Sequence, residues 1–198
     1  MAHAEVSAPL RILLVEDSEH DAVAFHRAFR KAAALYDIAL CECAEEALAR
    51  LYDQTSSFDL VVADYMLPGM SGLELYRELR SSNISIPLVL LTGAGAEYLA
   101  VEALKAGVDD YIIKDASRGY INLLPIVLPE VVQRYRARLE HQRIQNALSE
   151  RESQLRLVTD ALPVGISYVD VEQCYRFANR TCEVWVGQAT NRSVRQAY

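Results

Sequence analysis

The sequence predicts a doubly wound α/β fold, in which an open parallel sheet carries helices on both faces. Through about residue 130, short apolar runs alternate five times with segments of helical periodicity. This order of elements is typical of α/β domains with short, right-handed connections. Three of the runs are almost continuously apolar, which suits parallel strands that helices cover on both sides.

Five apolar runs are the predicted strands. They are residues 10–15, 38–43, 60–64, 87–92 and 111–114, with the sequences LRILLV, IALCEC, LVVAD, PLVLLT and YIIK. Their lengths are those of ordinary strands. In an open parallel sheet, ligands bind beyond the carboxyl ends of the strands. The residues at these ends are therefore the first place to look for a site.

The segments between the runs have the spacing of amphipathic helices, with apolar residues at i, i+3, i+4 and i+7. Phe25 and Phe29 place such a face on the first helix, and Gly107 is expected to end the fourth as a C-terminal cap. The spacing is complete at Ala44, Ala47, Leu48 and Leu51, and again at Gly72, Leu75, Tyr76 and Leu79.

Beyond residue 120, a last domain helix is expected to continue into a long signalling-type helix. Pro125 suits a first turn, whereas Pro129 should remove one helical hydrogen bond and bend the segment. A heptad-like apolar seam, interrupted by Arg151, runs through Ile144, Leu148, Leu155, Val158 and Leu162. We expect a homodimer through this helix, in the form of a coiled coil. A helix packed back on its own domain is the alternative.

Composition excludes several classes of partner. Twenty basic and twenty-seven acidic residues give a formal net charge of −7, which disfavours broad attraction to nucleic acid. The four cysteines form no C-x-x-C pair, so we expect reduced thiols and no zinc site. No apolar run approaches the ~18–20 residues of a membrane span, and the N-terminus lacks signal-peptide features. These patterns predict a cytoplasmic protein with no membrane partner.

Charged and hydroxyl side chains stand at the ends of the predicted strands: Glu16, Asp17, Asp64, Thr92 and Lys114. Because the carboxyl ends of parallel strands meet at one edge of the sheet, these side chains should converge. Clustered carboxylates repel one another, and Mg²⁺, which prefers oxygen ligands and recruits phosphate oxygens, relieves that repulsion. Asp64 is then a candidate nucleophile toward phosphorus, with Thr92 and Lys114 as donors to phosphoryl oxygens.

Four motifs carry a family resemblance: LLVEDS, DYMLPGMSG, LLTG and DDYIIK. With them, residues 10–130 resemble the receiver domain of two-component response regulators. The resemblance implies a flavodoxin-like sheet of strand order 2-1-3-4-5. It also implies a histidine kinase or phosphotransfer protein as the partner that supplies a phosphoryl group.

The resemblance assigns roles to individual residues. Asp64 would be the phosphoacceptor, and Lys114 would bind the transferred group. Thr92 and Tyr111 would form the switch pair, whose rearrangement changes the partners of the face made by the fourth helix, the fifth strand and the fifth helix. The Mg²⁺ ligands would be Glu16, Asp17, Asp64 and the backbone carbonyl of Met66.

Three positions depart from the usual receiver pattern. Asp115 follows Lys114 where most receivers have a proline with a cis peptide bond, so we expect a trans bond and a rearranged loop. Glu16 replaces the commoner aspartate and is expected to reach the metal through water. Met66 offers no side chain to orient an attacking water, which predicts a long-lived phosphoryl group.

The C-terminal residues resemble the opening of a PAS domain. The resemblance rests on ALPVGISYVD and YRFANRTCEVWVG, with Asn179 at the usual asparagine position. The predicted domains are a receiver over 8–130, a signalling helix over 131–160 and a truncated PAS start over 161–198. We expect a piece of a longer receiver–helix–PAS protein whose output is a histidine kinase or a diguanylate cyclase.

Two other functions remain open on the sequence. A phosphohydrolase with an aspartate nucleophile would often carry a second aspartate two positions on, where Met66 stands. A receiver-like scaffold that works without phosphorylation, through its dimerising helix, is kept open by Asp115. On the favoured interpretation, the chain is not a stand-alone enzyme and catalyses only its own phosphorylation.

Overall fold

The computed structural model describes residues 9–31, 36–53, 57–93 and 97–187. Residues 8 and 188–198, which belong to two of the predicted domain ranges, lie outside the described residues. The elements are β1 (Leu10–Val15), α1 (Glu19–Lys31), β2 (Tyr36–Cys41), α2 (Ala44–Tyr52), β3 (Leu60–Asp64), α3 (Gly72–Ser81), β4 (Leu88–Gly93), α4 (Glu97–Ala106), β5 (Asp110–Lys114), α5 (Gly119–Asp160), β6 (Ser167–Val169), β7 (Tyr175–Ala178) and α6 (Arg180–Gly187).

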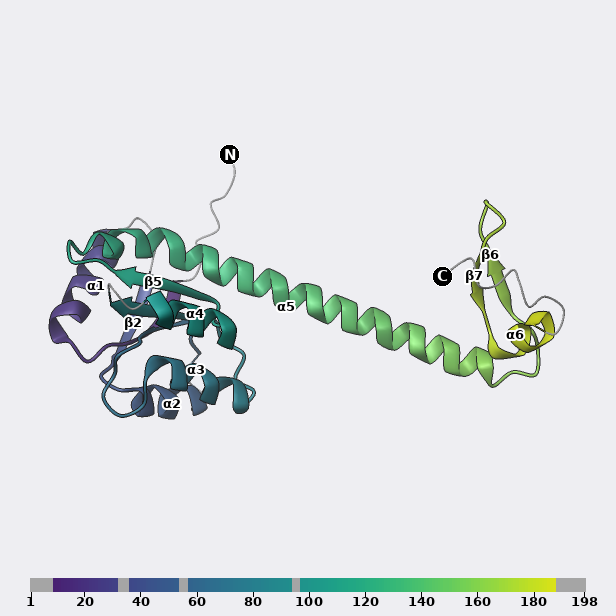
Figure 1. Cartoon of the computed structure of the whole chain (residues 1–198), viewed down its shortest axis with the longest axis horizontal. Helices are drawn as coiled ribbons and strands as arrows, with labels where there is room; N and C mark the ends of the chain where they lie inside the picture. The colour runs from purple at the N-terminus through teal and green to yellow at the C-terminus, as the bar shows by residue number, and fades with distance from the viewer. Residues whose placement is uncertain (1–8, 32–35, 54–56, 94–96, 188–198) are drawn as a thin grey trace. The chain divides into compact units, whose positions relative to one another are not determined.

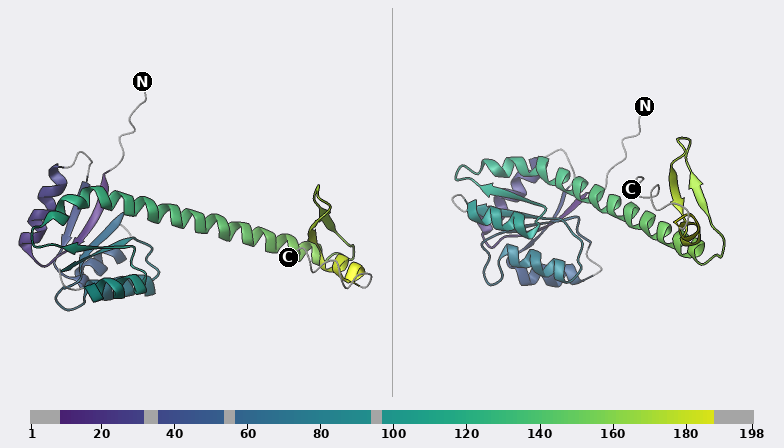
Figure 2. Two further views of the ribbon diagram at one scale, coloured as in Figure 1. Left: turned by 45° about the horizontal axis from the view of Figure 1, so that its top comes forward. Right: turned by 45° about the vertical axis from the view of Figure 1, so that its right-hand side comes forward.

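Strands β1 to β5 form one parallel sheet in the order β2-β1-β3-β4-β5, which confirms the predicted flavodoxin-like sheet (Figure 1). The register pairs Val15 with Ala63 and Asp64 with Leu91. The carboxyl ends of β1, β3 and β4 are thereby level with one another. Helices α1 and α5 cover one face of this sheet and α2 and α3 the other (Figure 2).

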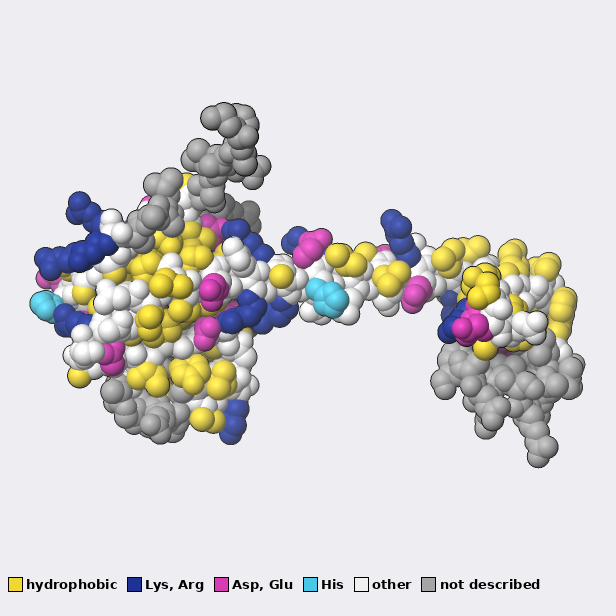
Figure 3. Space-filling model, turned by 90° about the horizontal axis from the view of Figure 1, so that it is seen from above, with side chains coloured by type: hydrophobic (Ala, Val, Ile, Leu, Met, Phe, Trp, Pro, Cys, Tyr) yellow, Lys and Arg dark blue, Asp and Glu magenta, His cyan; other side chains and the backbone are white. Residues whose placement is uncertain are grey.

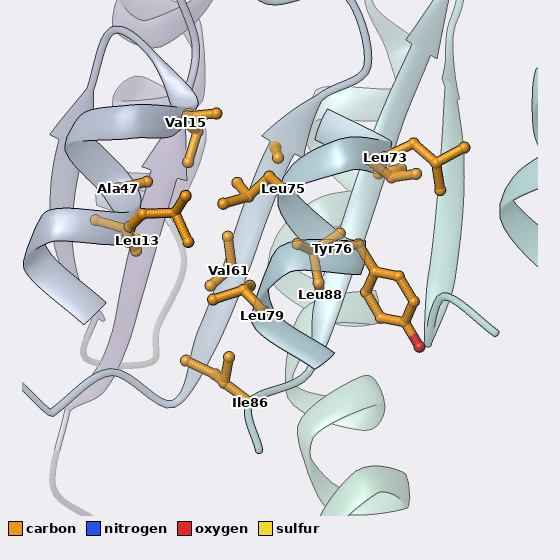
Figure 4. Packing of buried hydrophobic residues seen from close by; sticks show 14 of the residues in the cluster. Leu13, Val15, Ala47, Val61, Leu73, Leu75, Tyr76, Leu79, Ile86 and Leu88 are labelled. Carbon is orange, nitrogen blue, oxygen red and sulfur yellow. The ribbon is translucent and has the colours of Figure 1, made fainter. Parts of the chain in front are cut away.

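Each central strand sends alternate side chains into two separate cores. On one face, Leu13 and Val61 pack against α2 and α3, in the cluster shown in Figure 4. On the other, Ile12 and Val62 pack against α1 and α5. All four of these side chains are fully buried. Helices therefore cover both faces of these strands, which explains why their sequences are almost continuously apolar.

The second strand begins two residues earlier than predicted. The predicted range was 38–43, whereas β2 spans Tyr36–Cys41 and pairs Tyr36 with Leu10. The prediction missed this start because it followed runs of apolar residues, and Asp37 is polar. At the other end, Cys43 is already the extended N-cap residue of α2.

Helix α5 is one helix of 42 residues that runs through both of its prolines. Because Pro129 has no N–H, the carbonyl of Pro125 has no donor within the helix. The hydroxyl of Tyr36 on β2 donates to that carbonyl at 2.8 Å and replaces the lost bond. The ring of Tyr36 meets Phe29 of α1 edge to face. The proline is thus accommodated by a contact 89 residues distant in sequence.

Replacing Tyr36 by Phe should lower the free energy of unfolding by about 1 kcal/mol. The change keeps the ring but leaves the partly buried carbonyl of Pro125 without its donor. Urea denaturation measures the loss. Tyr52→Phe is the matched control, because the Tyr52 hydroxyl bonds Ser82 at the exposed surface and its removal should cost little. Equal losses in the two variants would contradict the assignment.

The described residues from 138 to 187 belong to a second compact unit, in which Asn179 links several segments. The Asn179 side chain is fully buried and its amide nitrogen donates to the carbonyls of Thr159 (2.7 Å) and Val164 (2.8 Å). Its oxygen accepts from the N–H groups of Ile166 (2.8 Å) and Cys182 (3.0 Å). One side chain therefore fastens the end of α5 to β6 and caps α6.

Every side chain from His141 to Val158 on α5 is exposed. Figure 3 shows apolar side chains among charged ones along this stretch. The seam residues Ile144, Leu148 and Leu155 are 58 to 64% exposed, so the described residues do not bury them. The described ranges contain no helix that combines the length and the apolarity needed to cross a membrane.

Candidate functional site

The structure brings the predicted acids and the predicted lysine together at one edge of the sheet. Glu16 and Asp17 directly follow β1, Asp64 is the last residue of β3, and Lys114 is the last residue of β5. Glu16 and Asp64 are buried, with 3% and 9% of their surface exposed, whereas Asp17 is exposed. Carboxylate oxygens of Glu16, Asp17 and Asp64 lie within 4.8 Å of one another.

Lys114 holds this acidic group together. Its ammonium donates to Glu16 Oε2 at 2.7 Å and also to Asp64 Oδ2. Burial alone would lower the pKa of Lys114, but the hydrogen bonds to Asp64 and Glu16 outweigh it and raise the pKa. The lysine is therefore charged at neutral pH. Burial also raises the pKa of Glu16, against the effect of the hydrogen bond from Lys114.

The donor set of this edge suits Mg²⁺. Three carboxylates against one ammonium leave a formal surplus of two negative charges. Oxygen ligands and such a surplus are what a hard divalent cation requires. Glu16, Asp17 and Asp64 are thus able to hold the metal ion that the sequence suggested.

The loop after β3 fixes the carboxylate of Asp64. The N–H of Met66 donates to Asp64 Oδ1 at 3.1 Å, while the Met66 side chain is 70% exposed. Helix α3 then starts with a capping box, in which Ser71 and Glu74 each bond the other's backbone N–H. A Cβ at Gly72 would lie 2.3 Å from the carbonyl oxygen of Asp64, so only glycine lets α3 start this close to β3.

The two predicted switch residues, Thr92 and Tyr111, lie on the neighbouring strands β4 and β5. Thr92 is buried on β4, which lies between the strands that carry Asp64 and Lys114. Tyr111 is half-buried on β5 and packs against the core on the α2–α3 face.

Two further charged residues adjoin the site and were not predicted. Asp21, in the first turn of α1, accepts from Lys114 at 3.4 Å through Oδ2 and pairs with Arg118 at 3.2 Å through Oδ1. Asp21 follows Asp17 by four residues and lies in the first turn of α1, and this spacing is the one sequence feature that could have indicated it. Arg118 stands in a loop, where periodicity carries no information.

Asp115 caps the N-terminus of α5. The described residues contain no cis peptide bond, so the bond after Lys114 is trans, as expected. The Asp115 carboxylate accepts from the N–H groups of Gly119 (3.1 Å) and Tyr120 (2.9 Å) and from the Ser117 hydroxyl. The residue that replaces the usual proline therefore supplies an N-terminal cap, which satisfies otherwise unpaired helix donors.

The Asp115 cap should weaken at low pH. The hydrogen bonds from Ser117, Tyr120 and Gly119 lower the pKa of Asp115 to about 2. Because the folded pKa lies below the ordinary value of about 3.9, the stabilisation is complete above that value and is lost as the pH falls toward 2. Wild type should thus exceed Asp115→Asn in stability at pH 6, and the difference in urea midpoint should shrink between about pH 4 and pH 2. A difference that grows on acidification would contradict this.

Residues 12–123 match the response regulator receiver domain family. Response regulator RppA of Synechocystis sp. is 34% identical over 128 residues, which cover 65% of this chain and 50% of that protein. Regulatory protein VanRB of Enterococcus faecalis is 40% identical over 105 residues, covering 53% of this chain and 46% of that protein. The chain spans about half the length of these relatives.

Solved structures of receiver domains share the fold. The receiver domain of a Francisella response regulator is 26% identical, with a TM-score of 0.55, covering 64% of this chain and 98% of that one. The phosphorylated cyanobacterial phytochrome response regulator RcpA is also 26% identical, with a TM-score of 0.55 and coverages of 62% and 93%. By fold and sequence, this chain belongs to the response regulator receiver domain family.

Proposed function

We propose that Asp64 accepts a phosphoryl group from the phosphohistidine of a histidine kinase or phosphotransfer protein. The observation that carries this proposal is the Lys114 ammonium bonded to Asp64 and Glu16 beside a third carboxylate. The phosphorylated relative RcpA, which shares this fold, supports it.

The side chains divide the chemistry among them. An oxygen of the Asp64 carboxylate forms the bond to phosphorus while the phosphorus–nitrogen bond breaks, and the departing imidazole nitrogen takes a proton from solvent. Lys114 transfers its hydrogen bond from the carboxylate to a phosphoryl oxygen, and the Thr92 hydroxyl donates to another. Mg²⁺, held by Glu16, Asp17, Asp64 and the Met66 carbonyl, would neutralise charge on the transferred group.

Phosphorylation would then change the surface near α4, β5 and α5. Thr92 turns toward the phosphoryl group and the Tyr111 ring moves into the space that it leaves. We propose that the chain responds as a homodimer through the exposed seam of α5. The exposure of Ile144, Leu148 and Leu155 supports this, because apolar seams at this spacing are stabilised by a second helix.

We further propose that the second unit is the start of a PAS domain. The antiparallel pair of β6 and β7, followed by α6 and fastened by Asn179, supports this proposal. The parent protein would carry its output, a histidine kinase or a diguanylate cyclase, beyond that domain.

The test is to incubate the chain with acetyl phosphate and Mg²⁺ and to measure phosphate incorporation. We expect an acid-stable, alkali-labile adduct that Asp64→Asn abolishes. Asp59→Asn is the matched control, because Asp59 precedes the same strand at the opposite edge of the sheet and should leave uptake intact. Because the Met66 side chain offers no polar group to orient an attacking water, the adduct should persist well beyond seconds.

Each alternative has its own outcome in this experiment. Absence of an adduct would overturn the proposal and favour a scaffold that works without phosphate. Continuous release of phosphate, with loss of the adduct within seconds, would favour a phosphohydrolase.

A further inference from the structure

The active-site lysine and the start of α5 share one carboxylate. Asp21 is 22% exposed at its side chain and lies between two cations, at 3.4 Å from Lys114 and 3.2 Å from Arg118. Lys114 bonds Glu16 and Asp64 as well. Asp21 is thus a charged bridge from the site at the end of β5 to the residue that directly precedes α5.

Arg118, which directly precedes α5, has an unfavourable backbone conformation. Its φ is +59°, a left-handed conformation that residues with a Cβ disfavour. Its N–H donates to the Asp115 carbonyl at 2.9 Å, and its own carbonyl accepts from Ile121, in the first turn of α5, at 3.2 Å. Such a conformation persists only where several contacts hold it. The ion pair with Asp21 is the contact that joins it to α1.

We propose that Asp21 is a positioning residue that couples the occupancy of Asp64 to the first turn of α5. This inference rests on the proposed phosphorylation of Asp64. A phosphoryl group adds negative oxygens beside Lys114 and draws the ammonium toward them. Of the Lys114 bonds, the one to Asp21 is the longest, and it breaks first. Asp21 then loses one of the two cations that fix its carboxylate among the described residues, and the remaining pair with the half-exposed Arg118 is of a weak kind. With its carboxylate partner less firmly placed, Arg118 and the turn that it starts become less well held.

Hydrogen exchange at the Ile121 amide, followed by NMR in the full chain, tests this coupling. In the wild type, phosphorylation by acetyl phosphate and Mg²⁺ should raise the exchange rate of this amide about two- to fivefold, the range that corresponds to loss of one exposed ion pair. In Asp21→Asn, the rate should already be raised without phosphate and should not rise further. Arg118→Gln should behave like Asp21→Asn, and Arg118→Lys should restore the response.

Asp110→Asn is the matched control. Asp110 pairs with Arg134, also on α5, at 2.8 Å, and no contact joins that pair to Lys114 among the described residues. This variant should keep the wild-type response. Phosphate incorporation is measured in the same samples. If the wild type takes no phosphate, the proposed function fails; if phosphate is taken up and Asp21→Asn still responds as the wild type does, the coupling through Asp21 fails.

Discussion

Lys114→Met should slow phosphate uptake from acetyl phosphate by about 10²–10³-fold. In the proposed reaction the ammonium of Lys114, which bonds Asp64 in the resting protein, lies where negative charge develops on the phosphoryl group. Removing one such fixed donor typically has an effect of this size. The aliphatic stem of Met preserves most of the packing, so the loss should appear in the rate of adduct formation at saturating Mg²⁺.

The control for this variant is Lys105→Met. Lys105 is an exposed lysine in the last turn of α4, and its replacement should leave the rate unchanged. Uptake by Lys114→Met at the rate of the control would show that the lysine only neutralises the acidic group in the resting protein.

Arg80→Met should reduce the free energy of unfolding by about 3 kcal/mol. The guanidinium of Arg80 pairs with Asp109 at 3.1 Å, where the Asp109 side chain is only 3% exposed. It also donates to the Ile86 carbonyl at 3.0 Å and lies over the ring of Tyr76 on α3. Removal of one member of such a buried ion pair costs far more than the pair contributes, because the remaining charge stays in the interior.

Arg77→Met, one turn earlier on α3, provides the comparison for Arg80. Arg77 pairs with Glu102 at 3.0 Å, but both side chains are about half exposed. Its loss should therefore cost less than about 1 kcal/mol. Urea denaturation of the two variants in one buffer measures both values. Similar losses would mean that burial does not govern the strength of these pairs.

The elements that periodicity predicted well are those whose environment is uniform along their length. The predicted third strand, 60–64, coincides with β3, because helices cover it on both faces from its first residue to its last. Gly107 ends α4 with a φ of +85°, as its position after an amphipathic segment indicated. The clustering of Glu16, Asp17, Asp64 and Lys114 was also predictable, because in a parallel sheet strand ends must share an edge.

The features that the sequence did not predict depend on contacts between segments that are distant in the chain. Helix α5 continues through Pro129 because the Tyr36 hydroxyl on β2 supplies a hydrogen bond. The residues around Pro129 in the sequence give no indication of such a donor. Asp115 is visible in the sequence as a departure from the usual receiver proline. Its role as the cap of α5 depends on the turn between β5 and α5, which the neighbouring residues do not reveal. The charges of Asp21 and Arg118 were visible, whereas their pairing required α1 and α5 to be placed side by side.

Gly72 should tolerate very few substitutions. Even alanine would bring its methyl group against the Asp64 carbonyl and against the Leu90 side chain, at 2.3 and 2.8 Å. The backbone that would have to yield belongs to the residue proposed to accept phosphate. A saturation library read separately for abundance and for signalling should therefore show position 72 depleted in both. Met66, which is exposed in the loop between β3 and α3, should accept most side chains without loss of abundance.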